Sequence, residues 1–71
     1  MAPTQVRNEI RRLRFEHGEM TQAALAERIG LTRQTVNAIE QGKYSPTLEA
    51  AFRIAIVFGR PLEEVFHYRG D

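Results

Sequence analysis

The stretch Gly30–Pro46, with the sequence GLTRQTVNAIEQGKYSP, predicts a short helix with a cap at each end. Thr32 is a favoured N-cap residue, because its hydroxyl can accept a hydrogen bond from a free backbone N–H of the first turn. Leu31 and Val36 flank that cap at the spacing of a hydrophobic staple. Gly42 is expected to terminate the helix.

The two sides of this helix differ in chemistry. Val36, Ile39 and Glu40 cluster on the side that is predicted to face the core. Solvated helix faces usually carry Glu and Lys at helix-supporting spacing, and the opposite side has no such charged pair. It carries long hydrogen-bonding side chains with one small residue among them: Arg33, Gln34, Asn37, Ala38 and Gln41. This composition favours a binding surface over ordinary solvated surface.

A second helix with the same features precedes this one. Thr21 predicts its N-cap, Met20 and Leu25 have the staple spacing, and Gly30 predicts its end in a left-handed conformation. The connection to the following helix is only a few residues long. Two short helices joined by a glycine-containing turn of this length are the signature of a helix-turn-helix.

Three further helices complete an all-α fold of five helices, since β-branched alternation is absent. The first is predicted from about Thr4 to His17, with its end at Gly18. The fourth is capped by Thr47 or Ser45, and Pro61 opens a short last helix.

Length and composition exclude several classes of protein. Seventy-one residues make at most one domain, expected as 1–71 with a core of about 6–66 and a short tail of 67–71. The chain has no cysteine, and its two histidines are too far apart for a zinc cluster. It has no nucleophile–base pair and no phosphate-cradling glycine loop, so neither an enzyme nor a cofactor is expected. No segment resembles a signal peptide or approaches the ~20 apolar residues of a membrane span, which makes the cytoplasm the default location.

Positive charge is concentrated in the amino-terminal half. Between residues 7 and 14, only Glu9 opposes four arginines: Arg7, Arg11, Arg12 and Arg14. For any single arginine, solvated surface is the better interpretation. The distribution as a whole fits a polyanionic partner.

The polar helix face suits the major groove of DNA, which admits one helix and displays a distinct pattern of donors and acceptors for each base pair. Arg33 can donate two hydrogen bonds to guanine, and Gln34 or Asn37 can both donate to and accept from adenine. Ala38 could rest against a thymine methyl or leave room for the DNA backbone. Phosphate contacts are expected from residues around this helix: Gln22, Lys43, Tyr44 and Ser45.

These features lie in a sequence that resembles the Cro/C1-type (xenobiotic-response-element) helix-turn-helix family, over about residues 6–66. The matching segments are LR at 13–14, TQAALA at 21–26, IG at 29–30, IEQGK at 39–43 and SPTLE at 45–49. The chain is especially similar to the small single-domain regulators of that family. The resemblance implies a lambda-repressor-like domain and a sequence-specific transcriptional regulator whose partner is double-stranded DNA.

The resemblance also implies roles for individual residues. Gln22 would contact phosphate and brace the recognition helix, and Arg14 would pair with Glu40 between the first and third helices. Arg60 departs from the family pattern, which often has an aliphatic residue there. Base edges would be contacted by Thr32, Arg33, Gln34 and Ala38, and phosphates by Asn37, Lys43 and Tyr44.

A homodimer on an inverted repeat is expected, because one domain of this size offers a small interface for a specific DNA site. The fourth helix is apolar almost all round. Its inward stripe is predicted as Leu48, Ala51, Phe52, Ala55 and Phe58, with Ile54, Ile56 and Val57 left over. The predicted dimer surface comprises Ile56, Val57, Phe66 and Tyr68, whereas Ile54 could equally complete the core. The tails FHYR are candidates for short strands that pair between subunits.

An alternative from a different class is a protein-interaction module of the same fold, such as a bridging factor or an antitoxin, whose polar helix meets protein. Arg33 and Gln34 beside Gln22 and Lys43 favour DNA over this alternative.

Overall fold

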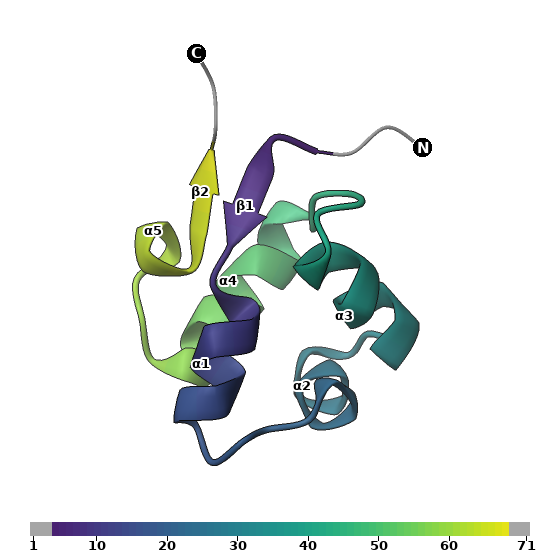
Figure 1. Cartoon of the computed structure of the whole chain (residues 1–71), viewed down its shortest axis with the longest axis vertical. Helices are drawn as coiled ribbons and strands as arrows, with labels where there is room; N and C mark the ends of the chain where they lie inside the picture. Colours follow the sequence, from purple (N-terminus) through teal and green to yellow (C-terminus); the bar gives the residue numbers. More distant parts are fainter. Residues whose placement is uncertain (1–3, 69–71) are drawn as a thin grey trace.

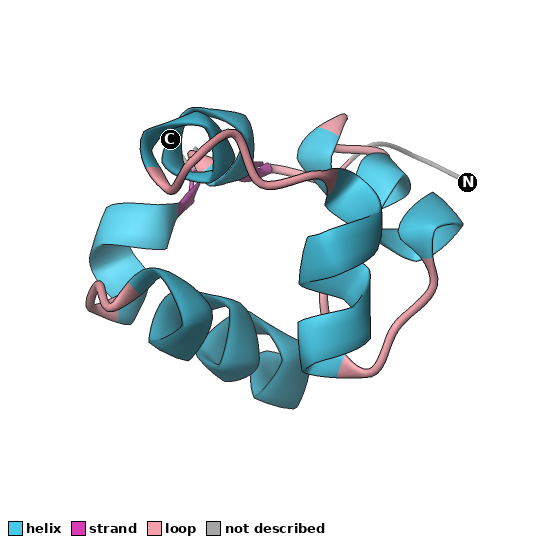
Figure 2. Cartoon of the chain, turned by 90° about the horizontal axis from the view of Figure 1, so that it is seen from below, coloured by secondary structure: helices cyan, strands magenta, loops and turns pink. Residues whose placement is uncertain are grey.

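The computed structural model of the chain describes residues 4–68. In chain order, its elements are β1 (Val6–Asn8), α1 (Ile10–Glu16), α2 (Gln22–Ile29), α3 (Arg33–Glu40), α4 (Leu48–Phe58), α5 (Leu62–Val65) and β2 (Phe66–Tyr68). The helices surround a common core, and the two-stranded sheet lies at one end of the molecule beside α5 (Figures 1 and 2). The mainly helical fold predicted from the sequence is confirmed.

The predicted helix-turn-helix is formed by α2 and α3. Thr21 Oγ1 accepts a hydrogen bond from Ala24 N at 3.0 Å, and Thr32 Oγ1 accepts one from Thr35 N at 3.1 Å. Between the helices, Gly30 has a φ of 74°. Because a residue with a side chain would be strained at this angle, glycine allows the chain to leave α2 and begin α3 within a few residues.

Apolar side chains from all five helices meet in the core. α3 contributes Val36 and Ile39, which are 1% and 2% exposed. Burial of each such side chain stabilises the fold by roughly 1.5–3 kcal/mol. These two residues therefore fix which side of α3 faces inward. The largest fully enclosed side chains are Ile10, Leu13, Leu25, Val36, Ile39, Ile54 and Val65.

The amino-terminal segment differs from the prediction. A helix from about Thr4 was expected, whereas Val6–Asn8 form β1 and the helix begins only at Ile10. Asn8 explains the boundary, because its Oδ1 accepts a hydrogen bond from Ile10 N at 3.1 Å and its Nδ2 donates to Ile39 O at 2.9 Å. Strand pairing and this tertiary contact override the helical spacing of the apolar residues.

The carboxyl-terminal strand pairs within the chain. Phe66–Tyr68 pair antiparallel with β1 of the same chain, which occupies one edge of β2, and the pairing of FHYR between subunits stays a prediction. Glu9 N also donates to Val65 O at 2.9 Å, which extends the connection beyond the two strands. The predicted tail is thus docked as far as Tyr68, and residues 69–71 lie outside the described residues.

The inward stripe predicted for α4 is correct only in part. Some of its residues are buried as expected: Ala51, Ala55 and Phe58. Ile54 is fully buried, whereas Leu48 and Phe52, which were expected inside, are 66% and 48% exposed. This helix is apolar on nearly every side, so the packing of its neighbours decides its orientation, and periodicity does not. Its buried residues are Ala50, Ala51, Ile54, Ala55 and Phe58.

The turn between α1 and α2 contains a strained residue. Glu19 has a φ of 57°, and this left-handed conformation costs a residue with a side chain roughly 1 kcal/mol. Asn adopts it more readily than Glu. We expect Glu19→Asn to raise the free energy of unfolding by about 0.5–1 kcal/mol in chemical denaturation. Glu19→Gln removes the same charge but keeps the strain, so an equal gain in both variants would assign the effect to charge.

Candidate nucleic-acid interface

One side of α3 is polar and open to solvent. Arg33 and Gln34, in the first turn, are exposed, and neither side chain forms a hydrogen bond with another residue among 4–68. Thr32 is also exposed, and its hydroxyl lies 2.9 Å from that of Thr35 and accepts the capping hydrogen bond. The first turn of α3 therefore presents a guanidinium and a carboxamide whose hydrogen-bonding groups are free for a ligand.

The start of α2 is braced against the middle of α3. Gln22 Nε2 donates to Asn37 Oδ1 at 3.1 Å, and Gln41 Nε2 lies 3.4 Å from the same oxygen. This is the brace that the resemblance assigned to Gln22. Since the Asn37 oxygen is engaged, its amide nitrogen is the group that remains for a ligand. Ala38 is half-buried beside it.

The loop after α3 is held in place by its backbone. Gly42 N donates to Ile39 O and Lys43 N to Ala38 O, both at 3.0 Å. Lys43 and Ser45 are exposed. The Tyr44 side chain is half-buried and packs against the core, so among the three predicted loop contacts the lysine and the serine are the more accessible.

An ion pair joins α1 to α3. Arg14 Nε donates to Glu40 Oε2 at 2.7 Å and Arg14 Nη2 to Glu40 Oε1 at 3.1 Å, which makes the pair bidentate. Arg14 Nη1 also donates to Met20 O at 2.8 Å. The two side chains are only 17% and 8% exposed. The structure thus brings together the residues that were expected to pair, and the pair fixes the carboxyl end of α3 against α1.

Other ion pairs lie within α1 and its N-cap, or connect α1 with the carboxyl-terminal elements. Arg12 bonds Glu9 at 3.1 Å and Glu16 at 3.0 Å, and the hydrogen bond with Glu9, followed by that with Glu16, raises the pKa of the Arg12 guanidinium. Arg60 pairs with Glu16 at 3.5 Å and with Glu64 at 3.3 Å. The residue that departs from the family pattern therefore connects α5 to α1.

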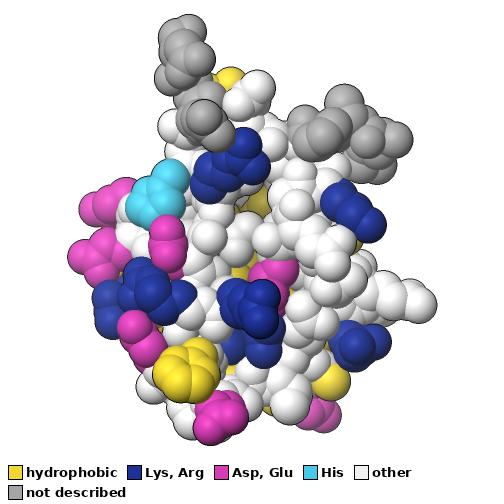
Figure 3. Space-filling model, in the orientation of Figure 1, with side chains coloured by type: hydrophobic (Ala, Val, Ile, Leu, Met, Phe, Trp, Pro, Cys, Tyr) yellow, Lys and Arg dark blue, Asp and Glu magenta, His cyan; other side chains and the backbone are white. Residues whose placement is uncertain are grey.

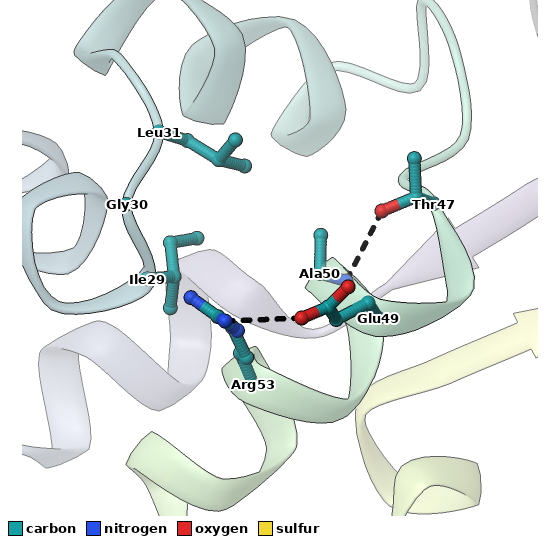
Figure 4. A pocket seen from close by; sticks show the side chains of 7 residues that line it. All are labelled: Ile29, Gly30, Leu31, Thr47, Glu49, Ala50 and Arg53. Carbon is teal, nitrogen blue, oxygen red and sulfur yellow. Dashed lines mark hydrogen bonds and ion pairs between the residues drawn. The ribbon is translucent and has the colours of Figure 1, made fainter.

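A shallow hollow lies between the α2–α3 turn and the start of α4 (Figure 4). Its polar groups bind one another, because Arg53 Nη2 donates to Glu49 Oε2 at 3.0 Å and Ala50 N donates to Thr47 Oγ1 at 3.1 Å. This arrangement stabilises the first turns of α4. Residues 4–68 contain no group of three or more acidic or histidine side chains that could hold a metal ion. No helix in the same part of the chain combines the length and hydropathy of a bilayer-crossing segment.

An apolar surface lies apart from the polar face of α3. Of the predicted dimer residues, Ile56 and Tyr68 are 76% and 73% exposed, whereas Val57 and Phe66 are partly buried against the core. Leu48 and Phe52 lie two helical turns and one helical turn before Ile56, respectively, and all three are exposed. Sequence periodicity missed these two residues because it assigned them to the core. A shallow apolar depression connects this surface to the sheet, lined by Val6, Ser45, Pro46, Leu48, Ala51, Leu62 and Phe66.

Comparisons with known proteins agree with this geometry. A family model described as helix-turn-helix matches residues 10–65. An uncharacterized HTH-type transcriptional regulator of Methanocaldococcus jannaschii is 44% identical over 66 residues, which cover 93% of this chain and 98% of that protein. One from Methanothermobacter thermautotrophicus is 52% identical over 62 residues, 86% of this chain and 88% of its own. One from Bacillus subtilis is 43% identical over 61 residues, 86% of this chain and 91% of its own. The chain therefore belongs to the Cro/C1-type helix-turn-helix family of DNA-binding transcriptional regulators.

Proposed function

We propose that this chain acts as a single sequence-specific DNA-binding domain, which inserts α3 into the major groove and regulates transcription without catalysing a reaction. The observation that carries the proposal is the exposed first turn of α3, where Arg33 and Gln34 are unbonded. A recognition helix needs long side chains whose hydrogen bonds to water can be replaced by hydrogen bonds to base edges. No contact within the protein should have to break for this to happen. These two side chains meet that requirement.

Each residue on this face has a chemical role in the proposal. Arg33 donates two hydrogen bonds to guanine, and Gln34 both donates to and accepts from adenine. Ala38, which is small and half-buried, lets the helix approach closely. Thr32 contacts a base edge beside them.

In the proposal, DNA phosphates are bound on either side of α3, the recognition helix. The side chains of Gln22 and Asn37 are hydrogen-bonded to each other at 3.1 Å, and both would bind the DNA backbone near the start of α2. Lys43, Tyr44 and Ser45 would bind it at the far end of α3. Contacts of this kind set the register of α3 in the groove and make affinity dependent on salt.

The proposed functional unit is a homodimer on an inverted repeat. What supports it is the exposed apolar surface of α4 and β2, which includes Phe52, Ile56 and Tyr68. Large exposed apolar side chains that gather on one surface mark candidate sites of association. A two-fold axis through this surface would give two α3 helices with a spacing of about 34 Å, one turn of DNA.

Substitutions on α3 and in its loop should have different effects. We expect Arg33→Ala and Gln34→Ala each to weaken binding to a selected site by ~1–3 kcal/mol and to relax one position of that site. Lys43→Ala should weaken binding to selected and random DNA by the same factor and reduce the salt dependence. Titration of both DNAs with the three variants measures this. Equal losses on both DNAs for Arg33→Ala would count against a base contact.

The proposal as a whole is tested by the salt dependence of binding to genomic DNA fragments. A steep linear fall of log K with log salt concentration is expected, because each bound phosphate releases counterions. Absence of binding to DNA at low salt would contradict it and favour the alternative, a module whose α3 face binds protein.

A further inference from the structure

The basic side chains of the protein divide into two groups. Within residues 4–68, four arginines form ion pairs: Arg12, Arg14, Arg53 and Arg60. Five basic residues form none with the described part of the chain: Arg7, Arg11, Arg28, Arg33 and Lys43. Basic and acidic side chains are interleaved on the side of the molecule where α5 lies, as Figure 3 shows. An unpaired cation keeps its full charge for a polyanion, so the second group contains the candidates for DNA contacts.

One member of that group, Arg7, is carried by β1 to the carboxyl end of α3. The strand is fixed there at two points, since Thr4 N donates to Gly42 O at 3.2 Å and Asn8 Nδ2 donates to Ile39 O at 2.9 Å. A methyl group placed on Gly42 would lie 3.9 Å from Nη1 of Arg7. The guanidinium therefore lies beside the loop, next to the residue that precedes Lys43.

Among residues 4–68, Arg7 forms no ion pair, and the acidic residue nearest to it in the chain is engaged by other side chains. His67 is its antiparallel partner in the sheet. Glu9, two residues further along the chain, is engaged by Arg12 at 3.1 Å and by His67 at 3.5 Å. The Arg7 side chain is exposed and forms no hydrogen bond with residues 4–68.

We infer that Arg7 is a phosphate-contacting residue, supplied to the DNA interface by the amino-terminal strand. This inference rests on the proposed function. Arg7 and Lys43 come from segments far apart in the sequence, yet both lie at the Gly42 turn. A phosphate near the carboxyl end of α3 would meet both cations. The planar guanidinium can bind two phosphate oxygens at once, whereas lysine acts as a point charge.

The test uses the intact chain and measures affinity for a selected DNA site and for random DNA across a range of salt concentrations. Arg7→Gln should weaken binding to both DNAs by the same factor and reduce the slope of log K against log salt by about one per subunit. Arg7→Lys should keep the wild-type slope. Arg12→Gln is the matched control, because it removes the same charge from an ion-paired arginine of α1 and should leave the slope unchanged.

The outcomes separate this inference from the proposed function. If the wild-type chain does not bind DNA, the proposed function fails. If the wild-type chain binds and Arg7→Gln keeps its slope, only the role of Arg7 is wrong, and the arginine merely lies beside the negative end of the α3 dipole. A loss restricted to the selected site would also overturn the inference, since it would indicate a base contact. Thermal unfolding of each variant shows whether it is folded under the binding conditions.

Discussion

The Glu40→Ala variant is expected to be about 3–5 kcal/mol less stable than the wild-type chain in urea denaturation. The Glu40 carboxylate is 8% exposed and accepts two hydrogen bonds from Arg14, at 2.7 and 3.1 Å. Its removal leaves a guanidinium that is 17% exposed without a charged partner, although the bond to Met20 O remains. Native proteins have only about 5–15 kcal/mol of stability in total, so this loss should be a large fraction of it and should lower the urea midpoint clearly.

Two further variants control for this prediction. Glu49→Ala breaks the exposed pair with Arg53, whose side chains are 76% and 54% exposed, and should cost about 0–1 kcal/mol. Glu40→Gln keeps an acceptor of the same size, so its cost should be smaller than that of Glu40→Ala. If Glu40→Ala cost no more than Glu49→Ala, the α1–α3 pair would be as well solvated as a surface pair.

If the chain forms the proposed dimer, the double variant Phe52→Gln/Ile56→Gln is expected to be monomeric at concentrations where the wild-type dimer forms. The two side chains are 48% and 76% exposed and lie one turn apart on α4, so the folded monomer should tolerate the change. Two-fold symmetry makes each substitution act twice at the interface. When the two α3 helices are no longer held together in one dimer, binding to a site with two half-sites should weaken by about 10²–10⁴-fold. Sedimentation and DNA titration measure the two effects.

The control for the dimer variant is Phe15→Gln on α1, which replaces a phenylalanine that is 70% exposed. It should leave both assembly and DNA binding unchanged. An unaltered dimer in the double variant would remove the α4 surface from the interface. A wild-type chain that stays monomeric without DNA would show that no constitutive dimer exists. Truncation after Val65 is unsuitable, because it removes β2 and leaves β1 without its partner.

The parts of the fold with local signals were predictable from the sequence. Thr21, Thr32 and Thr47 lie immediately before their helices and cap them through their hydroxyls, and Gly30 ends α2 at a positive φ. These features depend on residues within one turn of each other. The polar face of α3 could also be predicted from the sequence, because burial of Val36 and Ile39 fixes the orientation of the helix.

The parts that failed depend on contacts between distant segments. Val6 and Ile10 have helical spacing, but pairing with β2 and the bond from Asn8 to Ile39 make the segment before Ile10 extended. On α4, almost every face is apolar, so the pattern did not show that Leu48 lies outside and Ile54 inside. The position of Arg7 beside Gly42 follows from the same strand and was equally hidden.

Selection of bound sequences from a random DNA pool, with the wild-type chain and Arg33→Ala in parallel, tests most directly whether α3 reads bases. For the wild-type chain we expect enrichment of an inverted repeat whose half-sites are centred about 34 Å apart, one turn of DNA. For Arg33→Ala we expect the same repeat with one position in each half-site no longer specified. A pool without enrichment, or an identical motif from both proteins, would contradict the account.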